Sequence, residues 1–520
     1  MDTKSVPEDG PGDRAQSEIV ETVSSAMEKQ AGHNVHGAAE KGFVATDHRG
    51  HSLIQFDPEA ERRLRNKLDY MIVPTVSILY LFCFIDRANI GNARLAGFEK
   101  DLGLAGYDYN TVLSIFYISY IVFEIPSNLA CKWIGPGWFI PAISLGFGIT
   151  SLGTAFVQTR AAACGVRFLL GIFEAGMMPG ISYYLSRWYR RSELTFRLSL
   201  FIVMAPLAGA FGGLLASAIL LLDHFGSLHS WRMIFGIEGI ITIGLSVIAF
   251  LTLTDHPETA RWLSPAERDL AVARVKSERM AQANVLDKPD GRKLRLGFWN
   301  PMVLSTALIF LLNNITVQGL AFFAPTIVAT IYPSKTTIEK QLYTVPPYAL
   351  GAAFLIGLSL ASWRLDRRAL FIALSAPFTM LGYVLFLASR EPRVRYAAAF
   401  FTAVSCFALG PLANAQASAV VVSDTSRSVA IGTNVMFGNI GGLIATWSYL
   451  PFDAPDYKIG NGLNLAAASL ILVVSVLQIV WMRRDNERRE RRDVEAELRG
   501  LTPTEIESLE WKHPGFRWRP

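Results

Sequence analysis

Residues 84–97 read FIDRANIGNARLAG and carry an acid and an arginine, Asp86 and Arg87, within a stretch apolar enough to cross a bilayer. A second such stretch, RFLLGIFEAGMMPG, begins at Arg167 and contains Glu174. A charged side chain at membrane depth is costly, so it is usually paired, hydrated or functional. Two such pairs predict a transmembrane path for a charged solute.

The composition indicates an integral membrane protein. Of the 520 residues, 51% are hydrophobic and 18% are charged, whereas soluble domains average about 25% charged residues. The net charge of +5 gives no support to nucleic-acid binding. The four cysteines lie in or beside apolar stretches without metal-binding spacing, so we expect packing thiols, no metal site and no cofactor.

Twelve apolar stretches have the length of a membrane-spanning helix, about 20 residues. They lie at residues 70–92, 110–133, 138–157, 161–185, 194–222, 233–253, 298–331, 342–363, 369–388, 396–422, 429–450 and 463–481. A polar loop separates the first six from the last six. The sequence therefore predicts an all-α integral membrane protein with twelve transmembrane helices in two six-helix bundles and a site near the midplane between them.

The expected parts of the chain follow from this pattern. They are a disordered cytoplasmic tail at 1–57, an N-terminal bundle at 58–253, a cytoplasmic central loop at 254–296, a C-terminal bundle at 297–482 and a charged, solvated cytoplasmic tail at 483–520. Basic residues precede the first span, recur in the central loop and follow the last span, so the positive-inside rule assigns these segments to the cytoplasm. The opening MDTKSVPEDGPGDRAQ does not resemble a signal peptide, so we expect the first span to direct membrane insertion.

Several motifs resemble the major facilitator superfamily: FIDRANIGNARLAGFEKDLGL, FEIPSNL, RFLLGIFEAGMMPGISYYLSRWYRRSE and WRMIFGIEG. More narrowly they are similar to its anion:cation symporters, in the fungal allantoate and nicotinate permease branch, and HPGFRW near the C-terminus is similar to the ending common there. The resemblance runs from about residue 57 to residue 520. It implies uptake of small organic anions such as nicotinate, pantothenate, allantoate or sugar acids, with protons as the driving ion in the better-understood members.

Two loops depart from the superfamily pattern. The loop between the second and third spans usually carries an acid and several basic residues, but here NLACKWIGPGWF lacks the acid and most of the basic residues. The loop between the eighth and ninth spans reads ASWRLDRR, with Trp363 where an acid is expected. Either Asp366 substitutes for that acid, or the cytoplasmic latch between the bundles is weak.

Arg167 and Glu174 are seven residues apart, so they share one face of a helix at a separation of roughly 10 Å. The resemblance implies that Glu174 takes and releases the coupling proton, while Arg167 governs its proton affinity or binds the anion. Alternatively, both pair with polar groups of neighbouring helices and hold the bundle together.

Asp86 and Arg87 are adjacent, so their side chains leave the helix about 100° apart and cannot face the same partner. We expect Arg87 to bind a substrate carboxylate, which its planar guanidinium suits, and Asp86 to be a second protonatable group. The resemblance supports both roles. The alternative is that the two side chains lie near the outer end of the span and extend to water.

Further polar side chains in the spans are candidates for contacts with the neutral part of a substrate. They are Tyr117, Tyr120, Tyr183, Asn313, Asn314, Gln318 and Asn439. Packing and interhelical hydrogen bonds are the alternative roles. Glu124 is as easily structural as functional, because Pro126 disturbs the same helix, and we expect Glu238 to form a structural pair.

These observations predict a proton-coupled importer of a small organic anion, monomeric and embedded in the plasma membrane with both termini cytoplasmic. An exporter of drug-like or metabolite-like compounds and a non-transporting nutrient receptor remain alternatives. An ATP-driven pump is not expected because the chain lacks a Walker A loop, and an enzyme is the least expected class.

Overall fold

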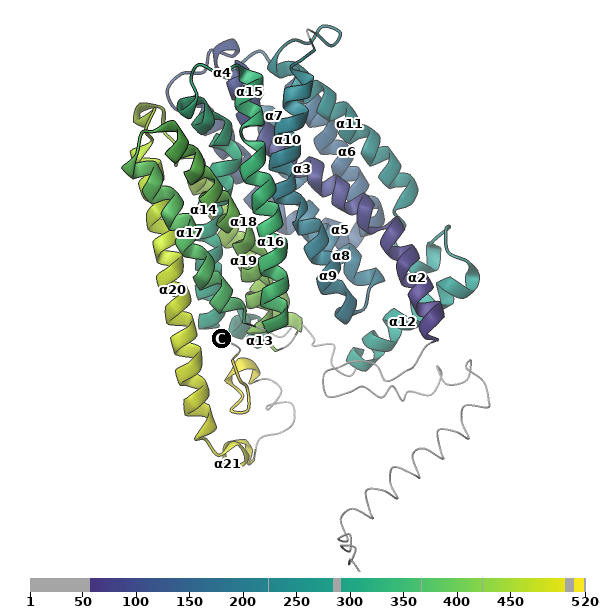
Figure 1. The fold of residues 1–520 in the computed structure, drawn as a ribbon. Coiled ribbons are helices and arrows are strands. Elements are labelled where there is room, and N and C mark those ends of the chain that lie inside the picture. Colours follow the sequence, from purple (N-terminus) through teal and green to yellow (C-terminus); the bar gives the residue numbers. More distant parts are fainter. Residues whose placement is uncertain are drawn as a thin grey trace, which may run out of the picture. The chain divides into compact units, whose positions relative to one another are not determined.

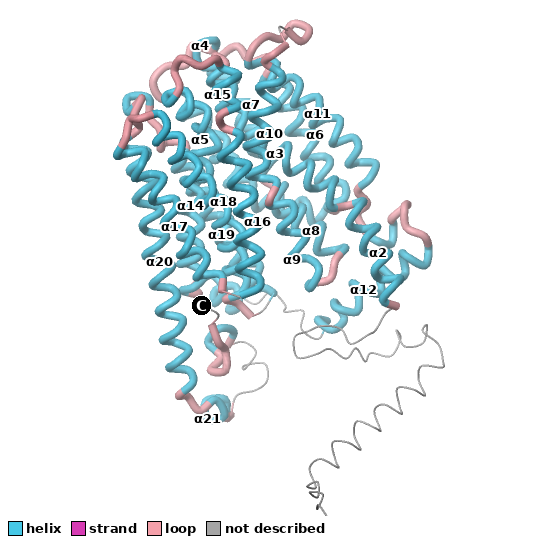
Figure 2. The backbone as a smooth tube through the Cα atoms, viewed as in Figure 1, coloured by secondary structure: helices cyan, strands magenta, loops and turns pink. Residues whose placement is uncertain are grey.

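The computed structural model describes residues 57–222, 224–283, 291–365, 367–422, 424–500 and 509–518. These residues fold into helices joined by loops (Figure 1; Figure 2). Residues 1–56 of the expected disordered tail lie outside the described residues, as do Asp366 and the side chain of Trp363. The contacts reported below belong to one compact unit, Asp57–Val275 with Leu286–Pro520.

The first set of membrane-length helices precedes the central loop. Its members are α3 (Val73–Leu95), α5 (Asp108–Ile134), α6 (Pro136–Thr154), α7 (Arg160–Glu174) with α8 (Met177–Trp188), α9 (Arg191–Ile202) with α10 (Met204–Ile219), and α11 (Trp231–Thr252). α5 packs along α7, α6 along α11, and α3 along both α10 and α11. Small residues allow this close packing: a Cβ atom on Gly171 would lie 2.4 Å from the carbonyl oxygen of Phe116.

The second set follows the central loop. Its members are α14 (Pro301–Ile331), α16 (Val345–Leu365), α17 (Arg368–Ala388), α18 (Pro392–Ala419), α19 (Asp424–Ala445) and α20 (Lys458–Glu490). α14 packs against α18, α19 and α20, while α17 packs against α18 and α20. The short helix α15 (Thr337–Leu342) precedes α16 and begins with a capping box between Thr336 and Glu339, a standard way to satisfy the first backbone N–H groups.

The lengths and composition of these helices match a membrane protein. In the described part of the chain, 10 helices are long and apolar enough to cross a membrane. The apolar part of α19, Val429–Ala445, is shorter, and α6, which is 19 residues long and contains Pro136 and Pro141, is not among those ten. With these two helices, the predicted all-α fold of twelve transmembrane helices is confirmed.

The connecting segments distinguish the two ends of the helix sets (Figure 1). At one end lie α4 (Phe98–Asp101) and α15. At the other end lie α2 (Pro58–Met71), α13 (Gly291–Phe298) and α21 (Val494–Leu498). We refer to these as the α4 end and the α2 end.

At the α2 end, ion pairs hold part of the central loop against the first set of helices. Arg274 on α12 (Pro265–Ala283) is 1% exposed and contacts Glu61 at 2.9 Å and Glu193 at 2.6 Å. Lys67 on α2 pairs with Glu267 on α12 at 2.7 Å. The predicted basic helix before the first span is therefore fastened to the central loop, which fixes the position of both.

The C-terminal residues fold back on the second set of helices rather than lying free in solvent. Trp518 is 3% exposed and packs with Met302 and Met482 in an apolar cluster at the α2 end. Its indole N–H donates to Asp485 at 2.6 Å, and its backbone exchanges two hydrogen bonds of 2.9 Å with Asn486. The ending HPGFRW is thus a docking segment for α20.

We expect Trp518→Ala to destabilise this end of the protein by about 3 kcal/mol, the usual cost of truncating a buried tryptophan. The thermal unfolding temperature of the purified protein in detergent measures the effect. Trp299→Ala is the matched control, because Trp299 is 63% exposed. Equal unfolding temperatures for the two variants would show that the tail does not stabilise the bundle.

Candidate functional site

A buried ion pair joins α3 to the end of α7. Arg87 lies midway along α3, and its Nε donates to Oε2 of Glu174 in a short contact. The side chains are 6% and 0% exposed, respectively. Neither residue extends to water at a helix end, so the pair lies in the interior of the first set of helices.

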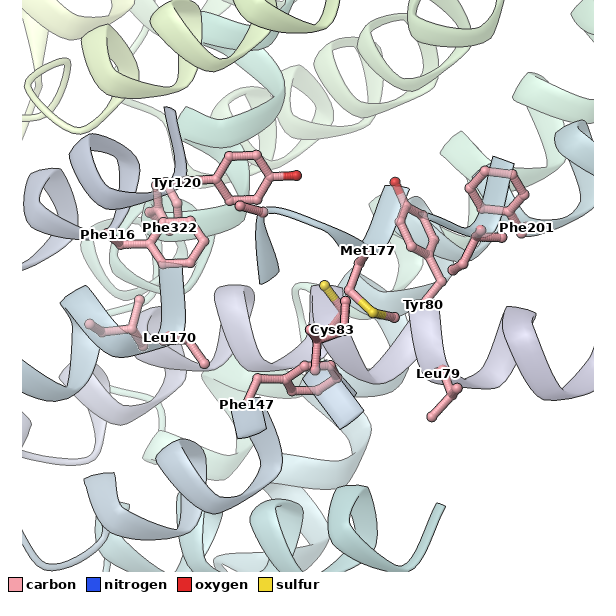
Figure 3. Packing of buried hydrophobic residues seen from close by; sticks show 14 of the residues in the cluster. Leu79, Tyr80, Cys83, Phe116, Tyr120, Phe147, Leu170, Met177, Phe201 and Phe322 are labelled. Carbon is pink, nitrogen blue, oxygen red and sulfur yellow. The ribbon is translucent and has the colours of Figure 1, made fainter. Parts of the chain in front are cut away.

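Aromatic rings enclose the guanidinium of Arg87. Its Cζ lies 4.8 Å from the ring centre of Phe84, 5.2 Å from that of Phe116 and 4.9 Å from that of Tyr120. Cation–π attraction to desolvated rings is worth about 2 kcal/mol or more. Figure 3 shows the buried hydrophobic residues in this region, among them Phe116 and Tyr120. The guanidinium of Arg87 is therefore held in place by these three aromatic rings as well as by Glu174.

Asp86 points to different partners, as its adjacency to Arg87 predicts. The hydroxyl of Ser151 on α6 donates to Asp86 Oδ1 at 3.0 Å, and Asp86 Oδ2 is buried without a hydrogen-bond partner among the described residues. Arg167 on α7 interacts electrostatically with Asp86 and lies over the ring of Phe235, 5.5 Å from its centre. One of the Arg167 nitrogens, Nη2, is likewise buried and without a described partner.

Glu238 on α11 is a buried acid whose position in this group the sequence did not reveal. It is 1% exposed, and the Nδ2 of Asn89 donates to its Oε1 in a short contact. Asn92 Nδ2 in turn donates to Asn89 Oδ1 at 2.8 Å. The sequence offered an acid within an apolar span and within the motif WRMIFGIEG, and neither signal says which helix the acid faces.

Five carboxyl and guanidinium side chains in the first set of helices are thus almost fully buried. They are Asp86, Arg87, Arg167, Glu174 and Glu238, each at most 5% exposed. Three carboxyl groups and two guanidinium groups leave an excess of one negative charge if all are ionised. Because an uncompensated buried charge is costly, the arrangement is suited to binding a proton or exchanging an anion.

A seam between α5 and α19 brings together polar residues from both helix sets. Asn439 Nδ2 donates to Glu124 Oε2 at 2.9 Å. Closer to the α4 end, the ring of Tyr117 lies against Gly442, where an added Cβ atom would approach the ring to 2.4 Å. The hydroxyl of Tyr117 is buried without a hydrogen-bond partner among the described residues. Tyr117 and Asn439 therefore face the boundary between the two sets, where a shared site would form.

The same boundary is tightly closed toward the α4 end. Asn110 donates to the carbonyl oxygen of Thr446 at 2.6 Å, and Ser114 shares a 2.8 Å hydrogen bond with the Thr446 hydroxyl. On α3, a Cβ atom added to Gly91 would lie 2.6 Å from the carbonyl oxygen of Phe322. The two sets are thus in direct backbone contact in this half.

The amide candidates on α14 occupy different positions. Asn313 and Gln318 are buried, and Gln318 lies one turn before Phe322 on the face that meets α3. Asn314 donates to the carbonyl oxygen of Phe310 in its own helix at 2.9 Å and packs against α19. Gln318 thus lies one helical turn from the residue through which α14 contacts α3.

Tyr183 lies apart from the buried charges. It is half-buried on α8, nine residues after Glu174, which corresponds to about 13 Å along a helix. Arg187 lies over its ring at 5.4 Å. The structure therefore places Tyr183 toward the α2 end, away from Arg87 and Glu174.

An acid from a distant segment occupies the loop that lacks one of its own. Asp255, just after α11, accepts a hydrogen bond from the backbone N–H of Gly137 at 3.1 Å and pairs with Arg187 at 3.0 Å. An added Cβ atom on Gly137 would lie 2.5 Å from the Asp255 backbone. The loop NLACKWIGPGWF thus receives a carboxylate from another part of the chain.

Comparison with known proteins supports this architecture. The sequence profile of the Major Facilitator Superfamily matches residues 76–446. The chain is 34% identical over 431 residues to the MFS transporter prlL of a fungal species (strain NRRL 50135). This match covers 80% of this chain and 85% of that protein. It is 29% identical over 490 residues to the high-affinity nicotinic acid transporter of Saccharomyces cerevisiae, covering 92% of this chain and 89% of that protein.

A solved structure has the same fold. It is a bacterial homologue of the human lysosomal transporter Spinster in an inward-facing, unoccupied conformation. The TM-score is 0.59 at 13% sequence identity, over 82% of this chain and 97% of that chain.

Proposed function

This chain belongs to the Major Facilitator Superfamily of transporters, and we propose that it imports a small organic anion together with protons. Its relatives are transporters and not enzymes. The observation that carries the proposal is the buried pair between Arg87 and Glu174. An internal arginine whose partner is a carboxylate can exchange that partner for the carboxylate of a substrate.

The exchange couples anion binding to proton binding. If a substrate carboxylate takes the guanidinium of Arg87, Glu174 remains buried without its counterion. A buried carboxylate that loses its cation is stabilised by binding a proton. One anion and one proton then enter together without leaving a net charge in the apolar interior, which is the balance that symport requires.

Residues at the boundary between the two sets are suited to bind the rest of the substrate. We propose Tyr117, Tyr120, Asn439 and Gln318 for its neutral groups, with Asn313 and Asn314 behind them on α14. Asp86 and Arg167 would act together with Glu174 in proton binding. Tyr183 lies beside Arg187, so its role would be on the path between the site and the α2 end.

The closed seam indicates the direction of access. The contacts of Gly91, Ser114 and Asn110 close the α4 end. The α2 end carries the basic residues of α2, the central loop and α20, which the positive-inside rule assigns to the cytoplasm. We therefore propose an inward-facing conformation of a plasma-membrane importer, with both termini cytoplasmic. Each half would rock about the midplane during transport.

A transport assay in proteoliposomes tests the proposal. The purified chain would be offered labelled nicotinate, pantothenate and allantoate, with and without an inward proton gradient. Accumulation of one anion that depends on the gradient is the expected result. Folded, inserted protein that accumulates none of them would favour the alternatives, an exporter of metabolite-like compounds or a receptor that binds without transport.

We expect Glu174→Gln to retain exchange of the transported anion across the membrane but to lose its gradient-driven accumulation. The amide keeps the shape of the side chain but cannot bind and release a proton. Counterflow and gradient-driven uptake, measured on the same vesicles, separate the two properties. Glu391→Gln at an exposed helix start serves as the control, and concentrative uptake by Glu174→Gln would refute the coupling role.

A further inference from the structure

Glu238 is a buried acid that the exchange between Arg87 and Glu174 does not use. It lies on α11, which packs along α6 and α3, and it is 1% exposed. Its contact within hydrogen-bond distance is with the neutral amide of Asn89. Its second oxygen, Oε2, is buried without a hydrogen-bond partner among the described residues.

The charged groups around Glu238 do not balance. α3 contributes Asp86, α7 contributes Arg167, and α6 contributes only the hydroxyl of Ser151, which donates to Asp86 at 3.0 Å. Arg87 is already paired with Glu174. Two carboxyl groups, Asp86 and Glu238, therefore interact electrostatically with one remaining guanidinium, that of Arg167. Two like charges that share one site cannot both remain ionised without a large cost.

We propose that Asp86 and Glu238 share one proton across Arg167, so that Glu238 is a further proton-binding carboxyl group of this transporter. This inference rests on the proton-coupled transport proposed above, and it adds a second protonation site to that function. The pair titrates as a unit, in which one group binds the proton while the other stays ionised.

The contacts favour Glu238 as the protonated member in this conformation. Asp86 interacts electrostatically with Arg167, and its carboxylate also accepts the hydrogen bond of Ser151. These contacts stabilise Asp86 in its ionised form. Glu238 has an amide for a partner and no ion pair among the described residues. Protonating Glu238 therefore costs less free energy than protonating Asp86.

A chain of amides connects Glu238 to the boundary that closes the α4 end. Asn89 binds Glu238, and Asn92 binds Asn89. The side chain of Gln341, on α15 in the other half of the protein, donates to the carbonyl oxygen of Asn92 at 3.4 Å. Gln341 also accepts from Ser217 on α10 at 3.4 Å. Loss of the proton from Glu238 would change the first bond of this chain, and thereby the contact that joins the halves.

Infrared spectroscopy of the full-length protein in lipid, comparing the wild type with variants, tests the proposal in the absence of substrate. We expect the C=O stretch of a protonated carboxyl group at neutral pH, which disappears in Glu238→Gln and persists in Glu174→Gln. The result that would overturn the proposal is a wild-type protein without this band, or a band that Glu238→Gln leaves intact and Asp86→Asn removes. Transport activity does not enter this measurement, so its outcome is independent of whether an anion is carried.

A second variant keeps the test decisive if Glu238→Gln does not fold. Asn89→Ala removes the hydrogen bond to Glu238 but leaves the carboxyl group, so the band should shift in frequency. Asn414→Ala, which breaks an amide–amide contact in the second set of helices, should not shift it. An unshifted band in Asn89→Ala would assign the proton to another residue.

Discussion

Arg87→Ala should abolish binding of the transported anion and destabilise the protein by about 3 to 5 kcal/mol, the usual cost of removing one partner of a buried ion pair. The side chain of Glu174 is 0% exposed, so it cannot turn to water when Arg87 is lost. The measurements are equilibrium binding of the anion identified in the transport assay and thermal unfolding in detergent.

The double variant Arg87→Ala with Glu174→Gln separates the two effects. It removes the uncompensated charge, so most of the lost stability should return. Anion binding should not return, because the guanidinium remains absent. Arg87→Lys is the conservative control: it keeps the charge but loses the planar fork that suits a carboxylate, so we expect weakened rather than absent binding.

The opposite pattern would separate Arg87 from the substrate site. If the double variant bound the anion with wild-type affinity, Arg87 would be a structural partner of Glu174 alone. The transported anion would then have to bind another cation, and Arg167 would be the next residue to test.

Gly91→Ala should shift the protein away from the conformation described here and reduce transport by roughly tenfold. An added Cβ atom at this position would lie 2.6 Å from the carbonyl oxygen of Phe322 and 3.4 Å from Pro325. Overpacking of this kind costs about 1 to 3 kcal/mol, and about 1.4 kcal/mol corresponds to a tenfold change in an equilibrium. Because the backbone of α14 cannot move aside alone, the two halves would separate at the α4 end.

Labelling of a reporter cysteine measures this separation. Thr446→Cys, placed in a Cys164→Ser background, should be protected from a membrane-impermeant maleimide because Thr446 is buried in the seam. Adding Gly91→Ala should speed its labelling. Gly165→Ala is the matched control, since no atom lies within 4 Å of a Cβ built there. Unchanged labelling with Gly91→Ala would mean that this contact does not hold the α4 end closed.

The proposed substrate and proton site was predictable only in part. The depth of Asp86, Arg87, Arg167 and Glu174 within apolar spans was evident, because charge in an apolar stretch is a local property of the sequence. Their pairing was not evident. The expectation that Arg167 and Glu174 share one helix face gave no sign that Arg87, 87 residues away, reaches Glu174.

Contacts between distant segments account for the residues that pattern reasoning missed. Glu238 belongs with the buried charges because α11 packs against α3, and Glu124 meets Asn439 across a separation of 315 residues. Asp255 supplies the acid that the loop at Gly137 lacks. Each depends on how separate segments pack in three dimensions, which the hydropathy of a span does not encode.

The amino-acid sequence alone was sufficient for the twelve spans and the helical class, because the cost of placing polar backbone and charge in lipid acts on each segment separately. The superfamily followed from the resemblance of short motifs, which is also a local property of the sequence. The tertiary structure decided which charges meet and which end is closed. Those outcomes depend on distances of a few ångströms between side chains of different helices, and only the packing of all the helices together sets such distances.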